Sequence, residues 1–141
     1  MPKVGILIPA YEAGRTVAAV VAACRGIAGI SDIVVIDDGS TDDTLQNAKN
    51  AGAICIRHPE NRGKGAALCT GFAEASKLGW DAAITIDADG QHDPAAIPSF
   101  LEEYHRCGAG IIVGTRRRTV SELRKETSMP RKARCNFPEP C

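Results

Sequence analysis

Five short apolar segments alternate with helical patterns along the first 115 residues of this 141-residue chain. The segments are nearly continuous in apolar residues, which is typical of parallel strands covered on both faces. They lie at residues 4–8, 33–36, 53–56, 82–86 and 110–113. Such alternation predicts an α/β fold, in which right-handed crossover helices flank a doubly wound parallel sheet.

Four helices are expected between these strands, each with apolar residues at helical spacing. Thr16 is the expected cap of the first, and Ser40 or Thr41 of the second. Gly79 is expected to end the third helix. Pro98 predicts an irregular first turn in the fourth.

The charges are divided unevenly, although 17 basic and 17 acidic side chains give a formal net charge of zero. Residues 1–115 carry 9 basic and 14 acidic side chains, whereas residues 116–141 carry 8 basic and 3 acidic ones. The absence of an overall basic excess argues against a nucleic-acid partner. We expect residues 1–115 to form one domain and residues 116–141 a basic loop or poorly ordered tail.

The sequence also predicts a location. The longest apolar run, Val17 to Cys24, is far shorter than the roughly 18 residues that a membrane span needs. The first four residues do not resemble a signal peptide. No two of the six cysteines form a C-x-x-C pair, which favours free thiols in a reducing cytosol over disulfides or a zinc site. We therefore expect a cytoplasmic protein.

In a sheet of this kind, ligands bind beyond the carboxyl ends of the strands. The loop at residues 9–15 lacks the G-x-G-x-x-G dinucleotide fingerprint, and the chain lacks a G-x-x-x-x-G-K-[ST] phosphate loop. Asp37 and Asp38 follow the second strand, where carboxylates can accept hydrogen bonds from a base edge or ribose hydroxyls. We interpret this pair as functional and the next residues as a capped helix start, with Asp42 and Asp43 in its first turn.

The loop after the third strand begins at His58 and leads into a helix. Backbone N–H groups freed by Gly63 and Gly65, together with Arg62 and Lys64, suit a diphosphate. The sequence leaves His58 open between a functional residue and an ordinary loop residue.

The loop after the fourth strand carries Asp87 and Asp89. Two carboxylates at the end of a buried strand are costly unless they are paired or bound to a metal. With the carbonyl of Gln91 they offer hard oxygen ligands for Mg²⁺ or Mn²⁺, which one or two carboxylates and substrate phosphates can hold. The alternative is an accidental pair of loop aspartates. We interpret His92 as facing solvent and Asp93 as a helix cap.

Taken together, these loops resemble the family 2 glycosyltransferases with the GT-A fold, in particular the polyprenyl-phosphate and dolichyl-phosphate sugar synthases. The matching strings occur in the family's order at Ile8–Tyr11, Val35–Asp42, Glu60–Ala67, Asp87–Pro94 and Gly114–Arg116. Each string alone is weak, but five in order are specific. Members of the family continue beyond this length, so the resemblance implies a GT-A fold that is incomplete at the C-terminus, as in a truncated member.

The resemblance also implies roles for individual residues. Those near the nucleotide would be Pro9, Tyr11, Glu12, Asp37, Asp38, Lys64 and Arg116. Asp87 and Asp89 would be the catalytic residues and would hold a divalent metal, Mg²⁺ or Mn²⁺, together with Gln91. Glu12 stands where many relatives differ, since Tyr11 is followed here by Glu-Ala and in them by Asn-Glu.

The implied activity is metal-dependent transfer of a sugar, with inversion, from a GDP- or UDP-sugar to a polyprenyl phosphate or a similar acceptor. This would place the protein in the cytoplasm or at the cytoplasmic face of a membrane. The alternative is a nucleotide-sugar-binding module that keeps the donor half and transfers nothing. A haloacid-dehalogenase phosphatase or a receiver domain fits less well, because their aspartates belong on other strands. An uncovered fifth strand would favour association into a homo-oligomer.

Overall fold

The computed structural model of this chain describes residues 1–108 and Ile112. Within them, a four-stranded parallel sheet has the strand order β3-β2-β1-β4. The strands are β1 (Val4–Ala10), β2 (Ile30–Asp37), β3 (Ile54–Arg57) and β4 (Ala82–Thr85). The helices are α1 (Val17–Arg25), α2 (Thr44–Asn50), α3 (Lys64–Lys77) and α4 (Ile97–Cys107), and the 3-10 turn η1 (Pro94–Ala96) leads into α4.

The predicted α/β architecture is confirmed, together with four of the five predicted strands and all four helices. The predicted fifth strand, at residues 110–113, and the basic segment at residues 116–141 lie outside the described residues except for Ile112. Among residues 1–108, no helix has the length and apolar character that crossing a membrane requires.

The two central strands explain the continuous apolar runs in the sequence. β1 pairs with β2 on one edge and with β4 on the other, and all seven of its residues are buried. The last five residues of β2 are buried as well, and four of them, residues 34–37, pair with both β1 and β3. Strands enclosed on both edges and both faces contact water nowhere, so apolar residues are favoured at consecutive positions.

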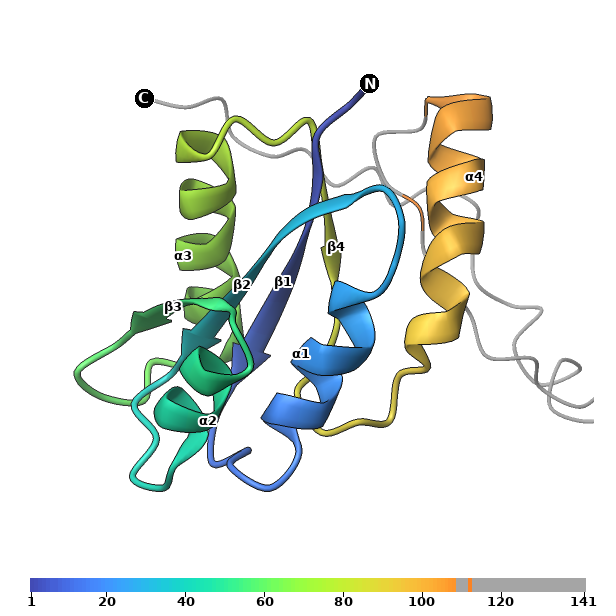
Figure 1. Cartoon of the computed structure of the whole chain (residues 1–141). Helices are drawn as coiled ribbons and strands as arrows, with labels where there is room; N and C mark the ends of the chain where they lie inside the picture. The colour runs from blue at the N-terminus through green and yellow to red at the C-terminus, as the bar shows by residue number, and fades with distance from the viewer. Residues whose placement is uncertain (109–111, 113–141) are drawn as a thin grey trace, which may run out of the picture.

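Helices cover both faces of this sheet (Figure 1). On one face, α1, α2 and α4 share a core with β1 and β2, to which Val17 and Leu101 contribute. On the other face, Ala67 of α3 packs with Leu7 and the neighbouring strand residues. A Cβ atom at Gly71 would lie 2.8 Å from a methyl group of Ile36, so glycine allows α3 to lie close to the sheet.

The predicted helix boundaries are correct at the end of the third helix and at the start of the fourth. Gly79 follows the end of α3 with a positive φ of 70°. Asp93 accepts a hydrogen bond from the Ala95 N–H at 2.9 Å and so caps η1, as its position before a proline predicts. The irregular start predicted from Pro98 is η1, whose tighter turn leads into α4.

The predicted start of α2 is wrong. The helix begins at Thr44, so neither Ser40 nor Thr41 caps it, and Asp42 and Asp43 precede its first turn. The Asp42 carboxylate instead accepts hydrogen bonds from the backbone N–H of Thr44, at 3.0 Å, and from its hydroxyl. The hydroxyl bond is the main cause that lowers the pKa of Asp42. Several adjacent residues here are of types that cap helices, and the sequence pattern alone does not select among them.

Candidate functional site

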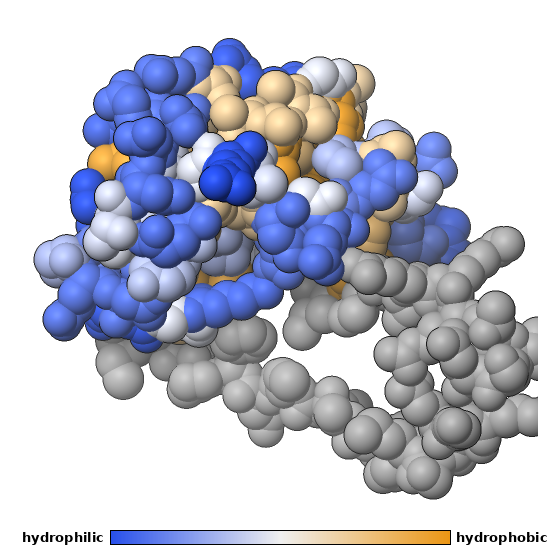
Figure 2. Space-filling model, turned by 90° about the horizontal axis from the view of Figure 1, so that it is seen from below, coloured by the Kyte–Doolittle hydropathy of each residue, from blue (hydrophilic) through white to orange (hydrophobic). Residues whose placement is uncertain are grey.

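A cleft of about 470 Å³ lies where the carboxyl ends of β1, β2 and β4 meet the start of α3. Figure 2 views the molecule from the end toward which β1 and β2 point, and hydrophilic residues cover most of that face. Seven of the predicted site residues line the cleft: Pro9, Tyr11, Glu12, Asp38, Lys64, Asp87 and Asp89. The fold thus gathers residues of four separate segments at one place.

Two further predicted site residues, Asp37 and Gln91, are described by the structure but do not line this cleft. Asp37 is fully buried at the end of β2. Gln91 is exposed on the loop that follows Asp89. Arg116 lies outside the described residues.

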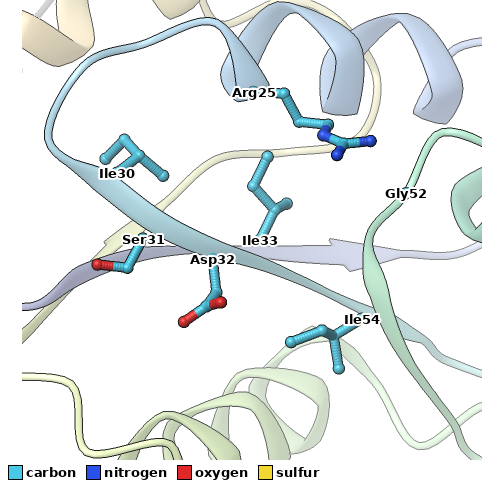
Figure 3. Close-up of a pocket in the computed structure, with 7 residues that line it drawn as sticks. All are labelled: Arg25, Ile30, Ser31, Asp32, Ile33, Gly52 and Ile54. Carbon is cyan, nitrogen blue, oxygen red and sulfur yellow. The ribbon is translucent and has the colours of Figure 1, made fainter.

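A second hollow, of about 300 Å³, lies at the opposite end of the sheet. Its lining includes Arg25, Asp32 and Gly52, beside the first residues of β2 and β3 (Figure 3). No residue predicted for the site lies there, and parallel sheets bind ligands at the carboxyl ends of their strands. The cleft is therefore the candidate site.

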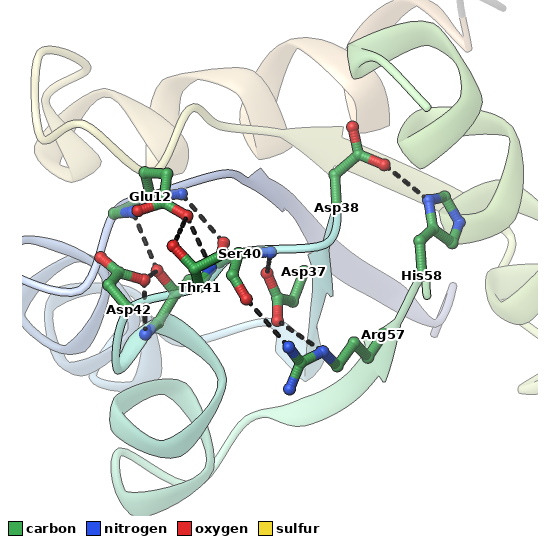
Figure 4. A network of polar contacts seen from close by, with 10 residues as sticks. Glu12, Asp37, Asp38, Ser40, Thr41, Asp42, Arg57 and His58 are labelled. Atoms are coloured by element: carbon green, nitrogen blue, oxygen red, sulfur yellow. Dashed lines mark hydrogen bonds and ion pairs between the residues drawn. The ribbon is translucent and has the colours of Figure 1, made fainter. Parts of the chain in front are cut away.

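Glu12 joins the loop after β1 to the loop after β2 (Figure 4). Its backbone N–H donates to Ser40 Oγ at 2.9 Å, and its Oε1 accepts from the backbone N–H of Thr41 at 2.6 Å. The Thr41 hydroxyl donates to the same oxygen at 3.0 Å. These bonds hold Glu12 at a φ of 50°, which is uncommon for residues other than glycine. The observed contacts of this carboxylate are within the protein.

Asp37 retains a buried oxygen without a hydrogen bond among the described residues. Its Oδ1 accepts from the backbone N–H of Ser40 at 3.0 Å. Its Oδ2 lies 3.7 Å from Nε of Arg57, too far for a hydrogen bond. A buried carboxylate oxygen without a hydrogen bond is costly, and the charge of Arg57 offsets part of this cost (Figure 4).

Asp38, in contrast, is occupied on both oxygens. Oδ1 accepts from Nδ1 of His58 at 2.7 Å and from the backbone N–H of Arg62 at 2.9 Å, and Oδ2 accepts from the N–H of Gly63 at 2.8 Å. Burial alone would raise the pKa of Asp38, but these hydrogen bonds together hold the pKa below its ordinary value. The carboxylate therefore stays ionised and fixes the loop that precedes α3.

The sequence left the role of His58 open, and the structure places it in this network. The side chain is almost fully buried, and its Nε2 lies 2.8 Å from the hydroxyl of Thr70 in α3. The register of parallel strands could have pointed to this residue. Asp37 pairs with Arg57, so the residues that follow, Asp38 and His58, leave the sheet side by side.

The two aspartates after β4 are more exposed and have fewer contacts. Asp87 forms an ion pair with Lys64, and its backbone N–H donates to Nδ1 of His92 at 3.2 Å. His92 is exposed, as predicted, but its ring contacts this backbone. Asp89 accepts from the backbone N–H of Gln91 at 2.9 Å, in a local turn.

The donor set of this loop fits a hard divalent cation. Among the residues that the structure describes, no group of three or more His, Cys, Asp or Glu side chains is placed to hold a metal by itself. Asp87 and Asp89 line the same cleft, however, and two carboxylates suffice for Mg²⁺ when substrate phosphates supply further ligands. Lys64 already places one positive charge beside Asp87.

Thr16 is a second residue whose role the sequence did not reveal. It stands before α1, as predicted for a cap, but its side chain forms no capping hydrogen bond. Its hydroxyl instead donates to the carbonyl oxygen of Ala88 at 2.6 Å, between the two aspartates of the cleft. Thr16 thereby fastens the loop after β4 to the loop after β1.

Residues 5–139 match the model of the family described as Glycosyl transferase family 2. The chain belongs to this family, as the five sequence strings had indicated.

Two relatives named as lipid-phosphate sugar transferases match most of this chain. The chain is 31% identical over 136 residues to the UDP-N-acetylglucosamine–dolichyl-phosphate N-acetylglucosaminyltransferase of Methanococcus voltae, covering 84% of this chain and 54% of that protein. It is 32% identical over 120 residues to the dolichol-phosphate mannosyltransferase of Pyrococcus furiosus, covering 81% and 33%. The chain thus spans about half or less of the length of these relatives.

Solved structures confirm the predicted type of fold. One similar structure is the glucosyl-3-phosphoglycerate synthase of Mycobacterium tuberculosis in complex with Mn²⁺, UDP-glucose and phosphoglyceric acid. The TM-score is 0.65 at 28% sequence identity, over 78% of this chain and 41% of that one. The sheet and helices described above are thus those of a GT-A glycosyltransferase domain.

Proposed function

We propose that this chain carries the donor site of a metal-dependent, inverting glycosyltransferase, which moves a sugar from a GDP- or UDP-sugar to a polyprenyl phosphate. The observation that carries the proposal is the cleft, in which Asp87, Asp89 and Lys64 face the loop that holds Tyr11. The relatives named for dolichyl-phosphate acceptors and the structure containing UDP-glucose and Mn²⁺ support it.

Each wall of the cleft suits a different part of a nucleotide sugar. The side chain of Tyr11 is exposed at the cleft, with 53% of the residue accessible, and offers an aromatic face to a base. Asp37 does not line the cleft; its Oδ1 holds the backbone of Ser40, whose hydroxyl accepts from the backbone of Glu12 at the cleft. Lys64 provides a positive charge for the diphosphate at the start of α3, where backbone N–H groups also favour anions.

Asp87 and Asp89, with the carbonyl of Gln91, are the residues that would hold Mg²⁺ or Mn²⁺. When bound, a divalent cation offsets the charge that develops on the departing nucleoside diphosphate. The ammonium group of Lys64, which forms an ion pair with Asp87 in the cleft, would add a second positive charge close to the departing diphosphate. Arg116, which lies beyond the described residues, is proposed to reach the phosphates.

The acceptor attacks the anomeric carbon in line with the leaving diphosphate, so the configuration inverts. A polyprenyl phosphate is already ionised near neutral pH and needs no strong general base, whereas a hydroxyl acceptor would need one. Because the acceptor is a membrane lipid, we place the reaction at the cytoplasmic face of a membrane.

A second candidate is a binding module that holds the nucleotide sugar without transferring it. It is favoured by the composition of the cleft, since all the predicted residues there belong to the donor side. In this case the same residues would bind the same ligand, and only the transfer step would be missing.

Two measurements on the purified chain separate these candidates. Calorimetry with UDP or GDP is expected to show binding that needs Mn²⁺ or Mg²⁺ and is lost on adding EDTA. Incubation with labelled UDP- or GDP-sugars and polyprenyl phosphate in detergent is expected to give a labelled lipid. Binding without transfer supports the module, and absence of metal-dependent binding contradicts both.

A further inference from the structure

A series of hydrogen bonds, buried at its centre, runs from α3 to the loop that carries Lys64. Thr70 contacts Nε2 of His58 at 2.8 Å, and Nδ1 of His58 contacts Asp38 at 2.7 Å. Asp38 in turn accepts from the backbone of Arg62 and Gly63. His58 is 4% exposed and Asp38 3%, so water has little access to the bond between them.

This series of hydrogen bonds ends at the cleft. Gly63 has a φ of 92°, directly precedes α3 and contributes with Lys64 to the lining of the cleft. Asp38 holds both N–H groups before Lys64, and the side chain of Lys64 reaches Asp87 on the opposite wall. The Asp38 carboxylate therefore fixes the backbone just before Lys64, and with it the point from which the Lys64 side chain extends toward the cleft.

The donors and acceptors in this series of hydrogen bonds determine which nitrogen of the His58 ring donates and which accepts. Backbone N–H groups only donate, so Arg62 and Gly63 require Asp38 to act as an acceptor. Nδ1 of His58 must then carry the proton that it shares with Asp38, and in the neutral ring Nε2 accepts from the Thr70 hydroxyl. Both ring nitrogens are thus engaged, and the ring has one orientation in which this is so.

We infer that His58 is a positioning residue, which locks the Asp38 carboxylate onto the Arg62–Gly63 backbone and thereby places Lys64 at the donor cleft. His58 touches no ligand itself and acts through Asp38. The hold of His58 and Asp38 on the Arg62–Gly63 backbone, called the loop clamp below, follows from the contacts above. Its importance for ligand binding rests on the proposed function.

Three variants separate the two hydrogen bonds of the ring. In His58→Asn the side-chain amide nitrogen can take about the place of Nδ1 and still donate to Asp38. In His58→Gln it reaches about the place of Nε2 and contacts Thr70 instead. His58→Leu makes neither bond and is of similar volume. A positioning role requires His58→Asn to behave like the unaltered protein, whereas simple filling of space would favour His58→Leu.

The first measurement is amide hydrogen exchange at Arg62 and Gly63, followed by NMR. Exchange is expected to rise about tenfold or more in His58→Leu and His58→Gln and to stay within about threefold in His58→Asn, since loss of a buried bond to a charged group weakens the clamp. His105→Asn, at an exposed histidine of α4, is the matched control and should change nothing at these amides. Unchanged exchange in folded His58→Leu would overturn the inference.

The second measurement is the Kd for UDP or GDP with Mn²⁺. We expect the Kd to rise about tenfold in His58→Leu and His58→Gln, and His58→Asn to restore the original value. Faster exchange with an unchanged Kd would overturn the link to the cleft. If the unaltered protein binds no nucleotide, the proposed function fails, while exchange at Arg62 and Gly63 still decides the clamp.

Should His58→Leu fail to fold, the two amide variants decide by themselves. They differ by one methylene group and by the ring nitrogen that they replace. Equal exchange at Arg62 and Gly63 in His58→Asn and His58→Gln would contradict a specific bond to Asp38, and slower exchange in His58→Asn supports it.

Discussion

The two aspartate pairs predicted for the site follow strands of the same sheet but have opposite environments. Asp37 and Asp38 are buried, and Asp38 is bonded to three groups of the protein. Asp87 is partly buried and lies beside Lys64 and His92, whereas Asp89 is exposed and accepts a hydrogen bond in a local turn. The first pair thus holds the neighbouring loops in place, while the second keeps its oxygens accessible to a ligand.

The comparison changes the meaning of the sequence motifs. The resemblance implied that Asp38 could contact a base or ribose, yet the structure shows its oxygens engaged with His58 and the loop before α3. Asp37 is fully buried and does not line the cleft, so its Oδ2 is not placed to meet a nucleotide there. Burial and hydrogen-bond partners, rather than residue type, distinguish carboxylates that hold the protein structure around a site from carboxylates that are accessible to a ligand.

Asp38→Asn is expected to have the largest effect on stability. The asparagine side chain has only one accepting oxygen for the three donors of His58, Arg62 and Gly63. Its NH₂ group would therefore face at least one of these donors without forming a hydrogen bond. We expect the free energy of unfolding to fall by about 3 kcal/mol, as when one partner of a buried charged network is removed. Urea unfolding measures this, with the exposed Asp43→Asn as control. A loss no larger than in that control would erase the contrast between the two pairs.

Asp89→Ala is expected to act on ligand binding alone. Its carboxylate is exposed, so the thermal midpoint should remain close to that of the unaltered protein. The Kd for UDP or GDP with Mn²⁺ should rise at least about 10- to 100-fold, the range found when even the supporting residues of metal sites are removed. Calorimetry measures this, with the exposed Glu102→Ala on α4 as control. Unchanged affinity would refute the metal assignment.

Thr16→Val tests whether the exposed pair also needs support from the fold. The variant loses the hydrogen bond to the Ala88 carbonyl but keeps the shape of the side chain. We expect a loss of about 1 kcal/mol in unfolding free energy, with a several-fold weaker binding of nucleotide. Thr16→Ser keeps the hydroxyl and should restore both. If serine and valine behave alike, the bond does not position the loop.

The smallest effect concerns pH. The hydrogen bonds of Asp38 lower its pKa below the ordinary value of 3.8, so its ionised form stabilises the fold. This stabilisation is fully present above that ordinary value and is lost as the pH falls through the lower pKa of the folded state. The stability difference between the unaltered protein and Asp38→Asn should therefore shrink as the pH is lowered from 5 to 3. Unfolding curves at both pH values measure it, and a constant difference would show that the charge is unimportant.

Much of the fold follows from local patterns in the sequence. The apolar runs at residues 4–8 and 33–36 correspond to the buried strands β1 and β2, because a strand enclosed on both faces admits few polar side chains. Gly79 and Asp93 mark helix ends, because their backbone and side-chain chemistry act within a few residues. The start of α2 could not be predicted, since Ser40 is engaged by the distant Glu12.

The sequence by itself determined the α/β architecture, the family and the set of polar residues at the carboxyl ends of the strands. Only the tertiary structure decided which of these residues are bonded to other parts of the protein and which are open to a ligand. Asp38, His58 and Thr70 are bonded across separations of 12 to 20 residues, and Thr16 reaches Ala88 across 72. Parallel sheets bring such segments together through long crossovers, so partners at the site are set by strand order and register. Neither is visible in the spacing of one segment.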